Sequence, residues 1–196
     1  MKSLLTPALT LLLFTLLPLP AIAAQDFHSK YAGQEQREIK SLSAADIKEL
    51  RRGGGWGLAK AAELNGVPGP AHILQMADEI KLSKKQREAI EKIHREMEIA
   101  AIALGEELIG LEKKLNRDFS RGTVSQASLE KSVREIAKVR ADLRIVHLST
   151  HLQTPKILRA EQIKRYNDLR GYATDPCLNI PAGHDAEMWK RHNNCK

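Results

Sequence analysis

Aromatic side chains are scarce in this sequence, at 4% of its 196 residues, and runs of Val, Thr, Tyr and Phe bounded by turns are absent. Strands favour such residues, so the composition argues against a β-sandwich, a barrel or the buried parallel sheet of a doubly wound enzyme. Ala, Leu, Ile, Glu, Lys and Arg dominate instead, and these residues favour helix. We therefore expect an all-α protein.

A recognisable catalytic set is also lacking. The chain contains no glycine-rich phosphate loop and no serine nucleophile elbow. Most of its carboxylates alternate with lysines and arginines at helix-face spacing, which is typical of a solvated surface. We predict that the protein is not an enzyme and that it requires no cofactor.

Long apolar runs are confined to the amino terminus. A positive start at Met1 and Lys2 precedes an apolar run from Leu4 to Pro20 and an A-x-A pattern over residues 21–23. This pattern predicts a secretory signal peptide cleaved near Ala23. The run contains three prolines and is too short for a good membrane span, so we expect an exported protein with no transmembrane segment after cleavage.

The strongest pattern in the sequence is helical. From 84 to 119 the apolar residues recur about every 3.6 positions, which is the helical period, and a second such stretch covers 124–153. Residues 120–122 (SRG) interrupt the pattern, so the two stretches are expected to pack as an antiparallel hairpin. Gly105 and Gly110, inside the first stretch, predict close helix packing or a bend.

Several shorter features complete this organisation. Four segments are expected: the signal peptide (1–23), an extension with short helices (24–67), the hairpin domain (68–172) and a carboxy-terminal tail (173–196). One hairpin cannot bury all of its apolar surface, because a second stripe of Ile145, Leu148 and Leu152 accompanies the main apolar line. We expect short amino-terminal helices to cover one side and a second copy of the chain to cover another, giving a homodimer.

Two short segments open the first long helix and the last short helix. Residues 82–86 (LSKKQ) and 158–162 (LRAEQ) resemble the LTxxQ motif of the Spy/CpxP family of bacterial periplasmic proteins. The hairpin between the two copies is similar to this family over residues 68–172. The resemblance implies a periplasmic ATP-independent chaperone or envelope-stress regulator, and the family also includes heavy-metal sensors. The residues that match the motif are Leu82, Ser83, Gln86, Leu158 and Gln162.

The motif also has a local structural interpretation. Ser83 is expected to cap the helix while Gln86, three residues later, reaches back to the main chain, which completes a capping box. Arg159 stands at the corresponding position of the second copy, so we expect the cap to be lost there.

Positive charge is concentrated in the hairpin domain as a whole. Residues 81–172 contain twenty Lys and Arg against thirteen Asp and Glu, whereas residues 24–80 contain seven against eight. Export argues against nucleic acid, so we expect unfolded or acidic proteins as partners and, by the resemblance, a membrane-bound sensor. The candidate client-binding residues are Lys84, Lys85 and Arg87. The alternative is that the charge only keeps the protein soluble.

Three histidines form a candidate metal site. His147 and His151 are four residues apart, which places them on one helix face, and the antiparallel register brings His94 level with them. Together they predict a site for zinc, copper or nickel. The alternative is three separate histidines that hydrogen-bond their own neighbours.

The only two cysteines, Cys177 and Cys195, lie in the tail. An even count in an exported chain predicts a disulfide. The alternative is a zinc site that these cysteines share with His184 and His192.

Overall fold

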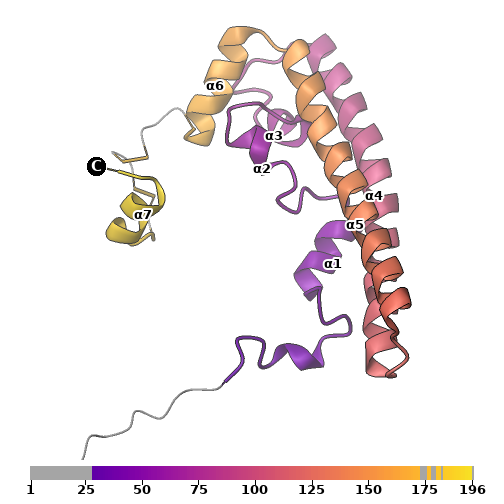
Figure 1. Ribbon diagram of the computed structural model, residues 1–196. Helices are drawn as coiled ribbons and strands as arrows, with labels where there is room; N and C mark the ends of the chain where they lie inside the picture. Colours follow the sequence, from indigo (N-terminus) through magenta and orange to yellow (C-terminus); the bar gives the residue numbers. More distant parts are fainter. Residues whose placement is uncertain (1–27, 173–175, 178–179, 182, 196) are drawn as a thin grey trace, which may run out of the picture. The chain divides into compact units, whose positions relative to one another are not determined.

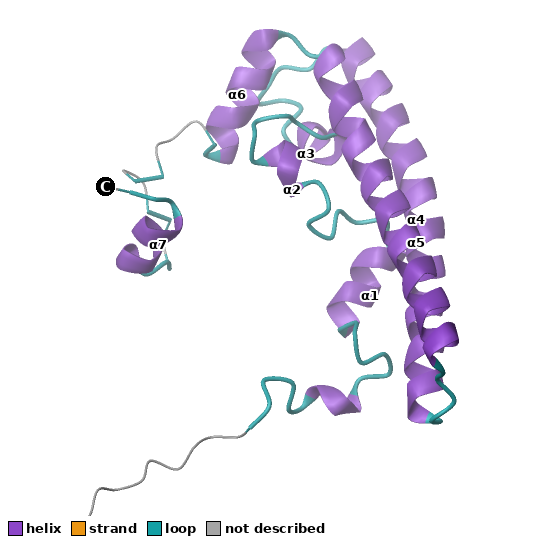
Figure 2. Ribbon diagram, in the orientation of Figure 1, coloured by secondary structure: helices purple, strands orange, loops and turns teal. Residues whose placement is uncertain are grey.

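A computed structural model of the chain describes residues 28–172, 176–177, 180–181 and 183–195. The chain divides into two units, 1–33 and Gln34–Lys196, and the features below belong to the second. Throughout the described part every regular element is a helix and none is a strand, which confirms the all-α prediction (Figure 2). The expected signal peptide lies outside the described residues.

Two long helices dominate the second unit. Helix α4 (Lys84–Ser120) and helix α5 (Gln126–Gln153) lie side by side and antiparallel (Figure 1), which confirms the predicted hairpin. Helix α5 begins two residues later than the expected 124, with Ser125 as its cap. The reason is that the Thr123 hydroxyl donates a hydrogen bond to the Asp118 carbonyl, 3.2 Å away, and so belongs to the turn that ends α4.

Short helices pack against this hairpin. Helices α1 (Ala44–Arg51) and α3 (Pro70–Gln75) contact α4, whereas α2 (Lys60–Glu63) contacts α5. Two short 3₁₀ helices, η1 (Gln34–Gln36) and η2 (Thr154–Lys156), and helix α6 (Ala160–Arg170) complete the body. Helix α3 is short, because the chain enters turns at Met76 and reaches a left-handed φ of 53° at Lys81.

The buried apolar side chains form two clusters. The larger joins the amino-terminal segment to the middle of the hairpin, and the smaller joins α3, α4 and α6 at the end of the hairpin away from its turn. Burial of this kind is the main stabilising contribution to a helical fold. The larger cluster contains Ile39, Leu42, Leu50, Ala101, Leu108, Ile109, Ile136, Val139 and Leu143; the smaller contains Ile73, Ile80, Ile90, Leu158 and Tyr166.

The two glycines of α4 have different surroundings. A Cβ atom on Gly105 would lie 2.5 Å from the Leu50 carbonyl oxygen, so this glycine lets the end of α1 approach the α4 backbone. Gly110 has open space around it. The prediction of close packing is therefore confirmed at Gly105 only.

The turn end of the hairpin has no core of its own. Between Glu112 on α4 and Ser132 on α5, none of the side chains is buried. Val133, which belongs to the expected apolar line of α5, is 48% exposed. The amino-terminal segment still reaches this part of α4, because Lys113 pairs with Glu38 and the Asn116 side chain bonds the main chain at Glu38 and Lys40.

The tail contains the predicted disulfide, between Cys177 and Cys195. Helix α7 (Ala186–His192) lies inside the loop that the disulfide closes. The Asp185 side chain caps this helix by accepting a hydrogen bond from the Met188 N–H. The Trp189 indole donates to the Pro176 carbonyl across 2.7 Å. With both sulfurs bonded to each other, neither is free to join His184 and His192 in a zinc site.

Candidate functional site

The two motif copies meet at the end of the hairpin opposite its turn. The Gln86 Nε2 donates to Gln162 Oε1 across 2.8 Å, and the Gln162 Nε2 donates to Gln86 Oε1 across 3.2 Å. Each amide also bonds a main-chain carbonyl: Gln86 reaches Ile157 at 2.8 Å, and Gln162 reaches Lys81 at 3.1 Å. We call this arrangement the glutamine junction. It joins the starts of α4 and α6 to the segment between α3 and α4.

Both motif copies also act as helix starts. The Ser83 hydroxyl accepts a hydrogen bond from the Gln86 N–H, and the Gln86 side chain accepts one from the Ser83 N–H, which confirms the expected capping box. The expected loss at the second copy is only partial, because the Arg159 N–H still donates to Gln162 Oε1 across 2.9 Å. The motif leucines contribute apolar packing, since Leu158 belongs to the smaller buried cluster and Leu82 packs against it.

A buried carboxylate fastens α6 to α2. One oxygen of Glu63 accepts hydrogen bonds from the hydroxyls of Tyr166 and Tyr172, and it lies 3.0 Å from Arg170 Nη2 and 3.2 Å from His72 Nδ1. Burial raises the pKa of this carboxyl, but the Tyr166 hydrogen bond and the charges of His72 and Arg170 outweigh burial, so the pKa is lowered overall. Sequence analysis missed this cluster, because Glu63 and Tyr166 are 103 positions apart without any local signal.

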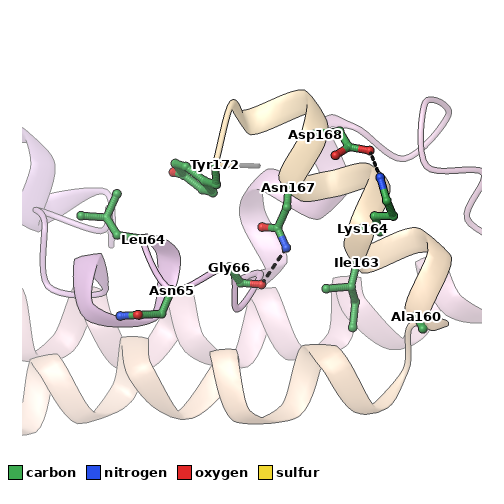
Figure 3. Close-up of a pocket in the computed structure, with 9 residues that line it drawn as sticks. All are labelled: Leu64, Asn65, Gly66, Ala160, Ile163, Lys164, Asn167, Asp168 and Tyr172. Atoms are coloured by element: carbon green, nitrogen blue, oxygen red, sulfur yellow. Dashed lines mark hydrogen bonds and ion pairs between the residues drawn. The ribbon is translucent and has the colours of Figure 1, made fainter. Parts of the chain in front are cut away.

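An open groove lies beside this cluster, between α6 and the turn that follows α2 (Figure 3). Its volume is about 630 Å³. The Asn167 amide spans it and donates to the Gly66 carbonyl across 3.1 Å, while Lys164 pairs with Asp168 on its rim at 3.0 Å. The apolar part of the lining comes from Leu64, Ala160, Ile163 and Tyr172.

The three histidines of the expected metal site differ in their surroundings. His151 Nδ1 lies 2.7 Å from the Val67 carbonyl oxygen, and its ring packs against Gly69. His147 is 3% exposed, and burial and the neighbouring His151 both lower its pKa. His94 is half-buried on α4.

These positions do not assemble a metal site. Over the described ranges, no group of three or more His, Cys, Asp or Glu side chains is placed to share a metal ion. The predicted cluster of His94, His147 and His151 is therefore not formed, because His151 is turned toward the main chain of the α2–α3 connection.

The candidate client-binding residues lie in the first turn of α4. Lys84 is exposed and 4.0 Å from Glu88, whereas Arg87 bonds Asp78 across 2.9 Å. Lys85 is exposed, and no ion-pair partner for it occurs among the residues that the structure describes. Cations at a helix start oppose the helix dipole, so the dipole does not account for this cluster.

Five large apolar side chains stand exposed on the hairpin itself. On α4, Ile99 is 71% exposed and Phe119 is 58% exposed; on α5, Ile145 and Leu152 are 60% and 69% exposed, and Val133 is exposed as well. Single exposed apolar residues are ordinary on proteins, but here they recur along both long helices. Helix α4 carries eight Lys and Arg against eight Asp and Glu, and α5 carries five against three.

Comparison of the chain with protein-family models, with curated proteins and with solved structures gives no match in any of the three. The resemblance to the LTxxQ family therefore rests on the two motif copies and on the hairpin between them. No helix in the described part of the chain combines the length and apolarity needed to cross a bilayer.

Proposed function

We propose that this protein is a periplasmic, ATP-independent holding chaperone that binds unfolded protein segments on the outside of its hairpin. The observation that carries the proposal is the set of exposed apolar side chains on α4 and α5, distributed among charged residues of both signs. Unfolded chains expose apolar segments of many sequences, and a shallow surface with separate apolar contacts accepts many of them. Binding of this kind needs no nucleotide.

The positive charge gives this surface a second role. Residues 81–172 carry a net charge of +7, and Lys84, Lys85 and Arg87 concentrate part of it at the start of α4. Surface charge of one sign raises the rate of encounter with chains of the other sign, and salt weakens that effect. We therefore infer a fast, salt-sensitive capture of acidic clients, followed by apolar contacts that hold them.

The first experiment measures whether the mature protein keeps an unfolded acidic client, such as reduced α-lactalbumin, from aggregating without ATP. Suppression of light scattering at a small molar excess is expected. Changing Phe119 and Val133 to Gln should weaken suppression, because both side chains are exposed near the turn. If the unaltered protein at high excess leaves aggregation unchanged, the proposal is wrong.

A second experiment tests the capture step. Replacement of Lys84, Lys85 and Arg87 by Gln should slow association with the client severalfold in stopped-flow fluorescence, and added salt should slow the unaltered protein in the same way. The matched control replaces Lys30, Lys48 and Lys60, three exposed lysines outside the hairpin, by Gln. If both triple variants associate with the client at equal rates, the net charge of the protein and not the start of α4 controls capture.

A further inference from the structure

Helix α5 carries a second regular line of residues on the side that faces away from the core. The spacings along this line alternate between three and four residues, which is a seven-residue repeat. Every member is exposed except Leu148, which is half-buried. We call this line the outer seam. It consists of Lys131, Arg134, Lys138, Ala141, Ile145, Leu148 and Leu152.

The outer seam is one continuous stripe. Each helical residue turns by about 100°, so a repeat of seven drifts by only about 20° around the helix. The buried residues of the same helix, among them Ile136, Val139 and Leu143, lie on the opposite side and pack into the larger cluster. Helix α5 is therefore patterned for packing on two sides, and within the described residues only one side is covered.

The seam has two chemically different halves. Toward the turn of the hairpin it presents Lys131, Arg134 and Lys138, and toward the other end it presents Ile145, Leu148 and Leu152. Lys138 is paired with Asp142 at 2.6 Å, whereas Lys131 and Arg134 have no ion-pair partner in the part of the chain that the structure describes. The residues that flank the seam are Glu130, Glu135, Asp142 and Arg144.

We propose that the outer seam docks one amphipathic helix of a partner protein, with apolar side chains on one half of that helix and Asp or Glu on the other. The seven-residue spacing favours a helix, because it allows side chains of two helices to interlock along a common stripe. The basic half selects acidic residues, which neutralise Lys131 and Arg134. This inference does not depend on the chaperone proposal, since an unfolded client needs no helical register.

A second copy of the chain fits the seam poorly. In a symmetric antiparallel pair, centred near Ala141, the basic half of each copy would lie on the apolar half of the other. In a parallel pair, Lys131 and Arg134 would face their own counterparts. Charge therefore favours an acidic helix from a different protein.

The test uses synthetic helical peptides of about three heptads that have Leu on one half of their seam positions and Glu on the other. One peptide places the acidic half first and another places it last, and a scrambled peptide of equal composition serves as control. Fluorescence anisotropy with the full mature chain should show that one ordered peptide binds about tenfold or more tightly than the scrambled one. Equal binding of all three, or no binding, would overturn the proposal.

Protein variants then locate the binding. Ile145→Gln with Leu152→Gln should weaken binding about tenfold or more. The control pair Leu64→Gln with Leu169→Gln, two exposed apolar residues outside the long helices, should leave binding unchanged. The variant with Lys131→Glu and Arg134→Glu should no longer bind the peptide that carries Glu. It should instead bind a peptide in which Lys replaces each Glu. Circular dichroism confirms that each variant is folded. If light scattering shows a dimer that only the Ile145 and Leu152 changes dissociate, a second copy occupies the seam and the proposal fails.

Discussion

The side-chain amides of Gln86 and Gln162 are hydrogen-bonded to each other in both directions, although 76 positions separate them in the chain. Gln162 is 2% exposed, and its Nε2 also donates hydrogen bonds to the Ile80 and Lys81 carbonyls. A buried amide with this many partners cannot be replaced without leaving main-chain groups unsatisfied. The glutamines of the two motif copies are thus structural partners of each other.

Replacement of Gln162 by Leu should lower the free energy of unfolding by about 1–3 kcal/mol, because the Lys81 carbonyl and the Gln86 amide lose buried partners. Urea unfolding followed by circular dichroism measures this loss. Gln153→Leu, at an exposed position at the end of α5, is the control and should change stability by less than about 0.5 kcal/mol. Equal effects of the two changes would contradict the importance of the glutamine junction.

The two glycines of α4 should respond in opposite ways to alanine. Gly105→Ala places a Cβ atom 2.5 Å from the Leu50 carbonyl oxygen, so α1 has to move and stability should fall by about 1–3 kcal/mol. Gly110→Ala meets no neighbouring atom and should stabilise the protein by about 0.5–1 kcal/mol, because alanine favours helix. Thermal unfolding of both variants measures these changes in stability. If both alanine variants were more stable than the unaltered protein, tight packing at Gly105 would be excluded.

The buried His147 predicts a loss of stability in mild acid. Its folded-state pKa is lowered, first by burial and then by His151, so as the pH falls through the unfolded-state value near 6.5 the unfolded chain binds the proton first. The free energy of unfolding should therefore decrease below about pH 6.5 until the folded group is also protonated. Glu63 has a lowered pKa too, but its contribution is lost only below its ordinary value of about 4.5, in a separate window.

A His147→Leu variant separates these effects. Urea unfolding between about pH 7.5 and 5.5 should give a flatter profile than the unaltered protein, because Leu cannot bind a proton. His94→Leu, which removes a histidine from α4, is the control variant, and its pH profile is measured in the same way. Identical pH profiles for the His147 variant and the unaltered protein would contradict the argument.

Calorimetry with zinc, copper and nickel tests whether the histidines bind metal in solution. Because the structure holds His151 against the Val67 carbonyl and does not assemble a three-ligand group among the described residues, changing His147 and His151 to Ala should leave any measured metal affinity unchanged. A large loss of affinity in the double variant would instead show that the helices rearrange to bind metal.

Local patterns of the sequence predict the local parts of the fold well. The helical period located both long helices, and the capping box at Ser83 is formed as expected. These features depend on residues within one or two helical turns of each other, so their signals are contained in a short stretch of sequence.

The candidate sites were harder to predict, because they depend on side-chain directions across distant segments. The motif search found Gln86 and Gln162 but not that they pair, and the four partners of Glu63 left no pattern at all. The predicted register placed His94 level with His147 and His151, yet it could not reveal that His151 bonds the main chain near Val67. Such contacts follow from the packing of the short helices, which a periodicity does not specify.

The absence of buried side chains near the turn divides the hairpin into regions of unequal local stability. Where α1, α3 and α6 pack on the long helices, opening the backbone would expose both buried clusters. Past Asn116, whose side chain still bonds the main chain at Glu38 and Lys40, no side chain is buried until Ser132, so the last turn of α4 and the first turn of α5 can separate without disturbing those clusters. Amide hydrogen exchange should therefore form a gradient along a single pair of helices, fastest near Gly122 and slowest near Ile90. The hairpin would then be a rigid anchor at one end and an adaptable arm at the other.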